Sequence, residues 1–360
     1  MIIFIAILVF ICLWQIQLRP AGNDNYIADY MSIDKTMAIK GIFILLVFFS
    51  HFNSYVDFTS ATDIAYYNVY KQIGQRMVTL FMFYSGYGVM EAISKKKMSY
   101  IHKIPVTRVV GTLFRFDIAV LCYIILNIII NKGTSQITAR RVILSLIGWE
   151  SIGNSNWYIF AILVCYVATF IGFEIFRDKL KYIPSAVTVT VIILAYVALL
   201  HFKELNATRF YNTVLCYPLG IFYSMYRDKF EKLIAKSSTL WAVLFVGSVI
   251  AAKVTYDHRS DRFFVYEISM FFFVAAVVLF TMQFSLNNKI LRFCGQHLFG
   301  IYIMQRIPMI VFKKLGLADF NIYVYFIVCL AATILIAYLF EKYVGKLWSL
   351  ISKPKPKQVK

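Results

Sequence analysis

The chain has 360 residues, of which 60% are hydrophobic and only 15% are charged, and it carries a formal net charge of +19 at pH 7. Soluble globular proteins contain about 45–50% apolar and about 25% charged residues, so this composition argues against an ordinary soluble enzyme. The basic residues stand in short connectors between apolar runs. This placement indicates contact with anionic lipid headgroups and argues against nucleic-acid binding.

Apolar runs long enough to cross a hydrocarbon layer of about 30 Å recur along the whole chain. We expect transmembrane helices at 2–18, 37–55, 73–93, 109–130, 157–176, 184–202, 211–226, 239–254, 263–284, 297–312 and 321–345. The sequence therefore predicts an all-α, polytopic helical membrane protein with about eleven transmembrane helices.

The two ends of the chain are predicted to lie outside the main membrane domain. Residues 1–20 have no basic residue before their apolar core and no A-x-A site after it, which favours a retained N-terminal anchor over a signal peptide. Residues 346–360 are expected to form a basic cytoplasmic tail. Lys and Arg on alternate connectors total 23 on one side and 13 on the other. This bias predicts an inner (plasma) membrane protein with its N-terminus outside and its C-terminus in the cytoplasm.

The motifs of common soluble enzymes are absent from the sequence. It has no Walker loop, no G-x-G-x-x-G, no H-E-x-x-H and no G-x-S-x-G. The six cysteines are scattered among the apolar runs without a C-x-x-C pair, so we expect neither disulfides nor a metal site. Any chemistry must come from ionisable residues inside the spans, where such residues are costly to bury.

Lys40 and His51 are the most informative ionisable pair. They are eleven residues apart, which returns to nearly the same face of a helix and separates them by about 16 Å along its axis. One face would then offer an anion site at its cytoplasmic mouth and a titratable base deeper inside. Alternatively, His51 is a hydrogen-bonded packing residue and Lys40 snorkels to the interface.

Arg108 and Arg115 form a second constellation after the aromatic stretch that contains Ser85 and Tyr87. They are seven residues apart and share a helix face. Because arginine does not deprotonate, a buried Arg115 needs either a bound anion or a carboxylate partner, and both interpretations remain open. The candidate carboxylates are Asp117, Glu91 and Glu267.

Residues 295–306 contain a third polar feature. Tyr302, Gln305 and Arg306 stand at i, i+3 and i+4, so they form a strip on one helix face. Hydrogen bonding between helices also explains such a strip. The Trp157–Tyr158 pair fits an outer aromatic belt.

The order and spacing of these motifs resemble those of the acyltransferase-3 family of integral-membrane acyltransferases over about residues 32–345. The resemblance rests on the spacing from Lys40 to His51, residues 82–87, the basic connector to Arg108, the Trp157–Tyr158 pair and residues 295–302. The sequence departs from the family pattern at Lys40, where the family usually has Arg, at Gly111, where a second Arg is expected, and at Gln305 and Phe299, where many members have His and Ser.

The resemblance implies a ten-helix acyltransferase domain at 32–345 with one accessory span before it. It implies transfer of an acyl group, most simply acetyl from acetyl-CoA, to a hydroxyl of a cell-surface polysaccharide or its lipid-linked precursor. His51 would act as general base or as a transient acyl carrier.

The other candidate residues take supporting roles in this hypothesis, and no metal is implied. Lys40, Arg108, Lys103 and, if it binds an anion, Arg115 would hold the phosphates of the acyl-CoA. Ser85, Tyr87 or Tyr302 would donate a hydrogen bond to the developing oxyanion.

Two other classes of membrane protein fit parts of the sequence. A transporter or flippase of a lipid-linked saccharide would also place internal charges along a substrate path, although no two matching halves are visible. A polysaccharide polymerase would be expected to carry a substantial outer-loop domain, and every connector is under about 30 residues.

Overall fold

The computed structural model describes residues 1–19, 25–71, 73–131, 137–259 and 263–352, and nearly all of its regular structure is helical. The helices of ten or more residues are α1 (Ile2–Leu13), α2 (Ile33–Phe52), α3 (Ala61–Lys71), α4 (Arg76–Lys96), α6 (Gly111–Asn131), α8 (Trp157–Glu174), α9 (Tyr182–Lys203), α10 (Cys216–Ile234), α11 (Ser238–Asp257), α12 (Phe263–Gln283) and α17 (Ile322–Ile351). The shorter elements are β1 (Ile16–Leu18), α5 (Met98–Ile101), the π-helix η1 (Pro105–Val110), α7 (Ala139–Leu146), the 3₁₀-helices η2 (Arg177–Lys179) and η3 (Thr208–Phe210), β2 (Phe284–Leu286), α13 (Lys289–Gln296), α14 (Leu298–Met304), α15 (Arg306–Lys314) and α16 (Leu317–Phe320).

Within this described part of the chain, six helical stretches are long and apolar enough to cross a membrane. They are Met98–Ile130, Trp157–Glu174, Tyr182–Lys203, Ser238–Asp257, Phe263–Gln283 and Ile322–Ile351. Many of their apolar side chains are exposed, as expected for helices that face lipid. The chain is therefore a multi-pass helical membrane protein, and the finer count of about eleven spans stays a prediction.

Two of the predicted spans are not single long helices. The first stops at Leu13, because Gln15 has a left-handed φ of 65° and the chain then pairs as β1 with β2 in a two-stranded antiparallel sheet. The predicted span 297–312 is divided between α14 and α15, with Gln305 between them. Pro308 lacks the N–H that would bond the carbonyl of Met304, which favours this break.

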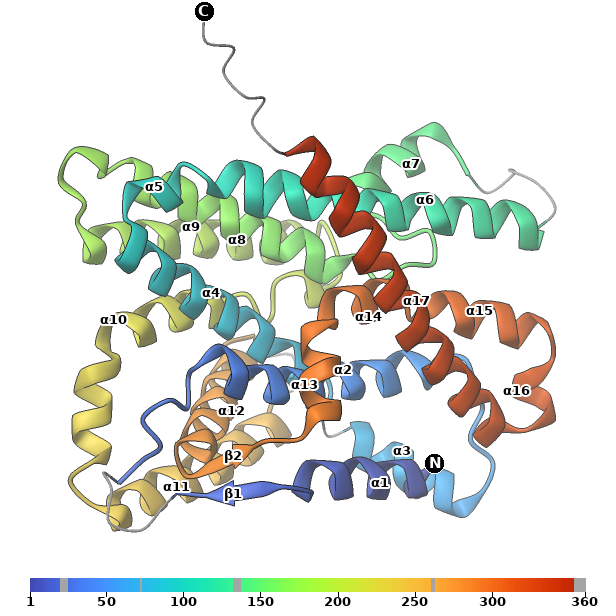
Figure 1. Cartoon of the computed structure of the whole chain (residues 1–360), viewed down its shortest axis with the longest axis horizontal. Coiled ribbons are helices and arrows are strands. Elements are labelled where there is room, and N and C mark those ends of the chain that lie inside the picture. Colours follow the sequence, from blue (N-terminus) through green and yellow to red (C-terminus); the bar gives the residue numbers. More distant parts are fainter. Residues whose placement is uncertain (20–24, 72, 132–136, 260–262, 353–360) are drawn as a thin grey trace, which may run out of the picture.

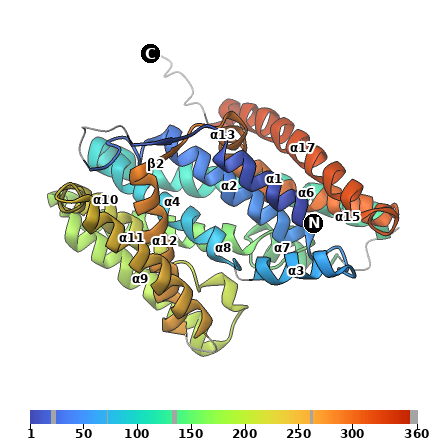
Figure 2. The same ribbon diagram turned by 90° about the horizontal axis from the view of Figure 1, so that it is seen from below.

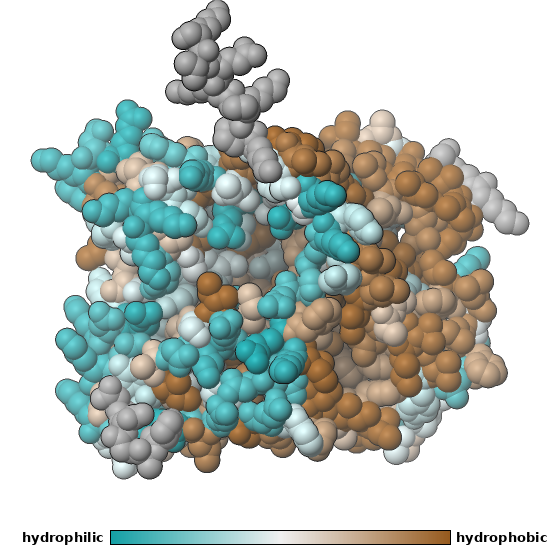
Figure 3. Space-filling view, in the orientation of Figure 1, coloured by the Kyte–Doolittle hydropathy of each residue, from teal (hydrophilic) through white to brown (hydrophobic). Residues whose placement is uncertain are grey.

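The long helices surround α2 and α4, which cross the centre of the molecule (Figure 1). Helix α13 packs on α2, and α10 packs on α4. Seen from below, α9, α11 and α12 lie along one side and α17 along the opposite side (Figure 2). On the face in Figure 3, hydrophilic residues gather over the side of α5 and α10, and hydrophobic residues gather over the side of α6 and α15. The hydrophilic side is thus the one toward which α4 and α10 extend (Figure 1).

Helix α2 has a well-defined start and a very close neighbour. The side chain of Ser32 accepts a hydrogen bond from the Lys35 backbone N–H at 3.3 Å, which satisfies one donor of the first turn. Farther along, a Cβ on Gly41 would lie 1.9 Å from the carbonyl oxygen of Leu291 in α13. A Cβ on Gly295 of α13 would come equally close to the backbone of α2. Only glycine permits this approach of the two helix backbones.

Helices α4 and α10 cross in the same manner. A Cβ on Gly86 would lie 2.0 Å from the carbonyl oxygen of Tyr217, and one on Gly220 would lie 2.1 Å from that of Phe83. Small residues at such crossings are typical of helix packing in membranes, where close backbone approach provides van der Waals contact. The two crossings set the positions of α2 and α4 relative to α13 and α10.

Replacing Gly86 with Ala should destabilise the fold by about 1–3 kcal/mol, because the added methyl group collides with backbone that has little room to move. The unfolding midpoint of the purified protein in detergent measures this loss. Gly88→Ala is the matched control on the same helix, since no described atom lies within 4 Å of its Cβ position. Equal unfolding midpoints for the two variants would contradict the close crossing.

Candidate active site

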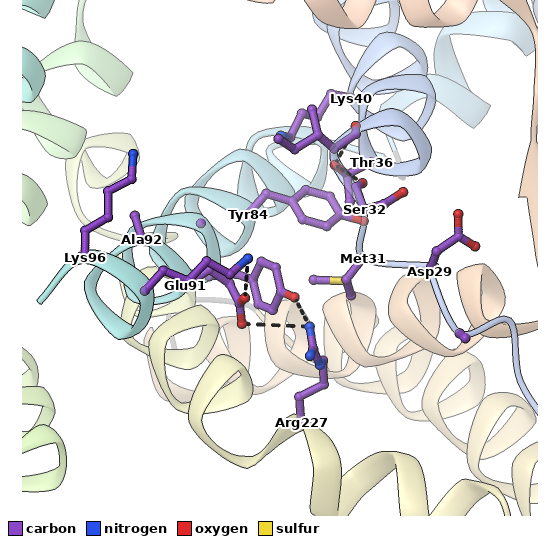
Figure 4. A pocket seen from close by; sticks show the side chains of 15 residues that line it. Asp29, Met31, Ser32, Thr36, Lys40, Tyr84, Glu91, Ala92, Lys96 and Arg227 are labelled. Atoms are coloured by element: carbon purple, nitrogen blue, oxygen red, sulfur yellow. Dashed lines mark hydrogen bonds and ion pairs between the residues drawn. The ribbon is translucent and has the colours of Figure 1, made fainter. Parts of the chain in front are cut away.

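A cavity of about 530 Å³ lies between α2, α4, α10 and the segment before α2 (Figure 4). Helix α2 contributes Thr36 and Lys40. Helix α4 contributes Tyr84, Tyr87, Glu91, Lys95 and Lys96, among others. The only residue of α10 on its wall is Arg227. The lining therefore combines hydroxyl groups with more positive than negative charges, the carboxylates being those of Asp29 and Glu91.

An ion-pair network occupies the α10 side of this cavity. The Glu91 carboxylate lies 3.6 Å from the Lys95 amine and 3.8 Å from the Arg227 guanidinium, and it accepts a hydrogen bond from Ser224 at 2.8 Å. Arg227 also donates to the Tyr87 hydroxyl at 2.6 Å (Figure 4). The charge of Arg227 is consequently balanced by carboxylates of this chain.

Lys40 reaches the cavity from α2 without such a partner. Its amine lies 5.3 Å from the centroid of the Tyr84 ring, and no carboxylate in the described ranges lies within ion-pair distance of it. The positive charge of Arg108 acts on the Lys40 amine as well. The part of the cavity near Lys40 is therefore electropositive and suited to an anionic group.

The other predicted donor-binding residues lie outside the cavity wall. Arg108 is exposed on η1, where its Nε donates to the Tyr100 hydroxyl at 3.0 Å and its guanidinium lies 6.0 Å from the Tyr166 ring centroid. Lys103 and Arg115 are both exposed. The structure thus brings Arg108 into electrostatic range of Lys40, but it does not bring Lys103 or Arg115 to the cavity.

None of the three carboxylates considered as partners for Arg115 pairs with it in the described structure. Glu91 binds Lys95 and Arg227 instead. Glu267 is 2% exposed and neither of its oxygens has a hydrogen-bond partner, while Asp117 is partly buried and leaves one oxygen unpartnered. Arg115 is exposed on the spanning stretch Met98–Ile130, and the described residues provide it with no carboxylate partner.

His51 lies at the other end of α2 and is partly buried. Its Nε2 is 3.2 Å from the Ser155 hydroxyl oxygen, a hydrogen-bond distance. The positive charges of Arg306 in α15 and Arg209 in η3 act on its ring. His51 therefore faces a different set of groups from Lys40, although both side chains come from one helix.

The loop before α8 holds Ser155 in place through its own hydrogen bonds. Ser151 donates to the Asn154 carbonyl at 2.7 Å, and Asn156 donates to the Gly148 carbonyl at 2.9 Å. The Cβ position of Gly153 lies 3.6 Å from Ile310 of α15, so the loop packs against that helix. Ser155 is buried by this packing, with 3% of its surface exposed.

A group of hydroxyl side chains connects α4 with α8. Ser85 of α4 lies beside the hydroxyls of Tyr158 and Tyr166 in α8. The Tyr158 ring centroid is 5.5 Å from that of Tyr302, whose hydroxyl is buried and unpartnered. Of the three predicted oxyanion donors, Tyr302 shares the charge of Arg306 with His51, Tyr87 lines the cavity, and Ser85 lies at the hydroxyls of Tyr158 and Tyr166.

Sequence reasoning missed Ser155 and Arg227 as parts of these sites. Three consecutive polar residues, 154–156, stand directly before the apolar run that begins at Trp157, and they indicate a polar loop there. The spacing in the sequence does not show that this loop lies at His51. Arg227 stands in a basic connector and was counted only for topology. No group of three His, Cys, Asp or Glu side chains that could hold a metal occurs among the residues the structure describes.

Comparison with known proteins identifies the family. A family model described as an acyltransferase domain matches residues 32–342, which is most of the chain. No curated protein and no solved structure matches the sequence. The matched region contains both ends of α2, the cavity at Lys40 and the groups around His51. The chain belongs to the acyltransferase-3 family and is a multi-pass membrane acyltransferase.

Proposed function

We propose that this protein transfers acetyl from acetyl-CoA to a hydroxyl of a cell-surface polysaccharide or its lipid-linked precursor, with His51 as general base. The observation that carries the proposal is the placement of two different groups on one helix. Lys40 lies at an electropositive cavity, and His51 lies eleven residues farther along with its Nε2 at 3.2 Å from Ser155. A donor can thus be bound at one end of α2 and react at the other.

Donor binding at the cavity uses the uncompensated charge of Lys40. Charged hydrogen bonds to phosphate oxygens are stronger than neutral ones, and the Lys40 amine has no carboxylate of the described chain to satisfy it. Arg108 adds a second positive charge near this end. Roles for Lys103 and Arg115 in phosphate binding stay predictions, since both side chains are exposed.

The reacting end is the group of residues around His51. The imidazole takes the proton of the acceptor hydroxyl, and the oxygen attacks the carbonyl carbon of the thioester. The carbon–sulfur bond then breaks, and His51 gives the proton to the leaving thiolate, which restores the neutral imidazole. The Ser155 hydroxyl orients the ring through its bond to Nε2. The unpartnered Tyr302 hydroxyl supports a role in binding the oxyanion.

Two further points concern the orientation of the protein in the membrane and the alternative that it is a transporter. The basic connectors gather at the Lys40 end of α2, so we propose that this end faces the cytoplasm and that the His51 end faces outward. Family membership favours the enzyme over a transporter or flippase. Covalent transfer from labelled acetyl-CoA to carbohydrate separates the two, because a transporter moves its substrate unchanged.

His51→Ala should lower acyl transfer by about 10²- to 10⁴-fold, the usual contribution of a general base. The measurement is label transferred from acetyl-CoA to a carbohydrate extract by the purified protein. His258→Ala is the matched control, because His258 is exposed and its Nδ1 lies at hydrogen-bond distance from the Val254 carbonyl of its own helix. Full activity of the His51 variant would remove this residue from the mechanism.

Ser155→Ala should lower kcat by about five- to tenfold, which corresponds to the loss of one hydrogen bond of roughly 1 kcal/mol. Ser155→Thr keeps the hydroxyl and should recover most of the rate, while KM for acetyl-CoA should change little in both variants. Steady-state kinetics at varied acetyl-CoA concentration measure kcat and the donor KM separately. If Ser155→Thr were as slow as Ser155→Ala, the hydroxyl would not be what positions His51.

Lys40→Glu should raise KM for acetyl-CoA by roughly 10- to 100-fold, because it replaces attraction of the phosphates by repulsion. Lys40→Arg keeps the charge and should bind the donor nearly as well as the unchanged protein. Donor KM at fixed acceptor concentration measures both. Equal donor KM in the two variants would exclude Lys40 from phosphate binding.

A further inference from the structure

Arg306 places a positive charge beside His51 that this chain does not balance. It begins α15, is partly buried, and its guanidinium lies 5.6 Å from the centroid of the Tyr55 ring. No carboxylate of the described ranges lies within ion-pair distance of it, and its Nε is buried without a hydrogen-bond partner. Arg306 is thus a partly buried arginine without a carboxylate partner in the described part of the chain. Arg76 is another, but its guanidinium donates to the Ala252 carbonyl and lies over the Tyr256 ring.

An arginine without a counter-ion is costly inside a membrane protein. Arginine stays protonated, so it cannot escape the cost of burial by losing its charge. Arg227 shows how this chain balances a cation, since Glu91 and Glu231 both lie within 4 Å of it. The contrast indicates that Arg306 receives its negative charge from a bound molecule.

The surroundings of Arg306 contain further buried polar atoms without partners. They are the Tyr302 hydroxyl and the Gln305 side-chain oxygen, and the Asn154 side-chain nitrogen is a third such atom, in the loop that packs against α15. These three side chains are 2%, 0% and 1% exposed, so water does not readily satisfy them. Buried polar groups normally have hydrogen-bond partners, and hydroxyl and amide groups are suited to the hydroxyls of a sugar.

Arg209 extends the positive potential toward the surface. It is exposed on η3, and its charge acts on both His51 and Tyr302 together with that of Arg306. An exposed cation in front of a partly buried one attracts anions from solution and raises their local concentration. The two arginines together make the His51 end electropositive and favour the binding of an anion there.

We propose that Arg306 binds a carboxylate or phosphate group of the acceptor, so that the acceptor is an acidic saccharide. The inference rests on the proposed function, because the acceptor hydroxyl must reach His51. The anionic group then fixes which hydroxyl of the saccharide lies at the imidazole. Arg306 acts on specificity and does not take part in proton transfer.

The test uses the purified full-length protein, labelled acetyl-CoA and carbohydrate extracted from cells that lack the protein. Anion-exchange chromatography separates the extract into neutral and acidic fractions. We expect label in the acidic fraction, and we expect carbodiimide-assisted reduction of carboxylates or phosphatase treatment to abolish labelling, according to which group is present. Labelling confined to the neutral fraction overturns the inference and leaves the proposed function intact. Labelling of neither fraction overturns the proposed function itself.

Kinetics of Arg306 variants provide a second test of the inference. Arg306→Gln should raise KM for the acidic fraction by roughly 10- to 100-fold with donor KM unchanged, and Arg306→Lys should lie between it and the unchanged protein. Lys313→Gln removes an exposed positive charge from the same helix and should change neither constant. Size-exclusion chromatography checks that each variant folds. A rise in donor KM instead of acceptor KM would assign Arg306 to the acetyl-CoA phosphates and contradict the inference.

Discussion

The close contact between α2 and α13 is the constraint on which the candidate site depends. Gly41 meets the backbone of α13 at a distance that leaves no room for a side chain, and Lys40 is its neighbour in sequence. The α4–α10 crossing at Gly86 likewise stands beside Tyr87. In lipid, where the apolar driving force between helices is weak, backbone contacts of this kind hold helices in register. The cavity therefore lies where two tightly packed helix pairs meet, and its side chains have fixed starting positions.

The balance of charge then separates structural cations from those available to ligands. Arg227 lies on the same cavity as Lys40, but its guanidinium meets carboxylates and the Tyr87 hydroxyl. Lys40 and Arg306 have no such partner among the described residues. A cation in a low-dielectric interior is costly unless a negative charge, a carbonyl dipole, an aromatic ring or water stabilises it. The two uncompensated cations thus mark the two ends of α2 as places where anionic parts of ligands are expected.

The sequence predicted helices in every apolar run and placed Lys40 and His51 on one of them, because both follow from local periodicity. It could not predict that Arg115 is exposed, since that depends on which face of α6 meets neighbouring helices. The contact of Ser155 with His51 could not be predicted for a related reason. The loop of Ser155 is positioned by hydrogen bonds and by packing against α15, and neither leaves a periodic pattern in the sequence. The break in the predicted span 297–312 was missed because the span was predicted from its apolar residues. That criterion takes no account of the N–H that Pro308 lacks.

The separation of charges along α2 explains how one helix can serve a reaction with two charged substrates. On the proposed function, the phosphates of the donor remain at Lys40 and the anionic group of the acceptor remains at Arg306. The distance between Lys40 and His51 along the axis is about 16 Å, so the uncharged part of the donor spans it. The Ser85 hydroxyl lies beside those of Tyr158 and Tyr166, so the interior of the bundle also offers hydroxyl groups. Placing a neutral thioester there costs far less than moving a phosphate through the same interior, so only the acyl group has to pass from one end to the other.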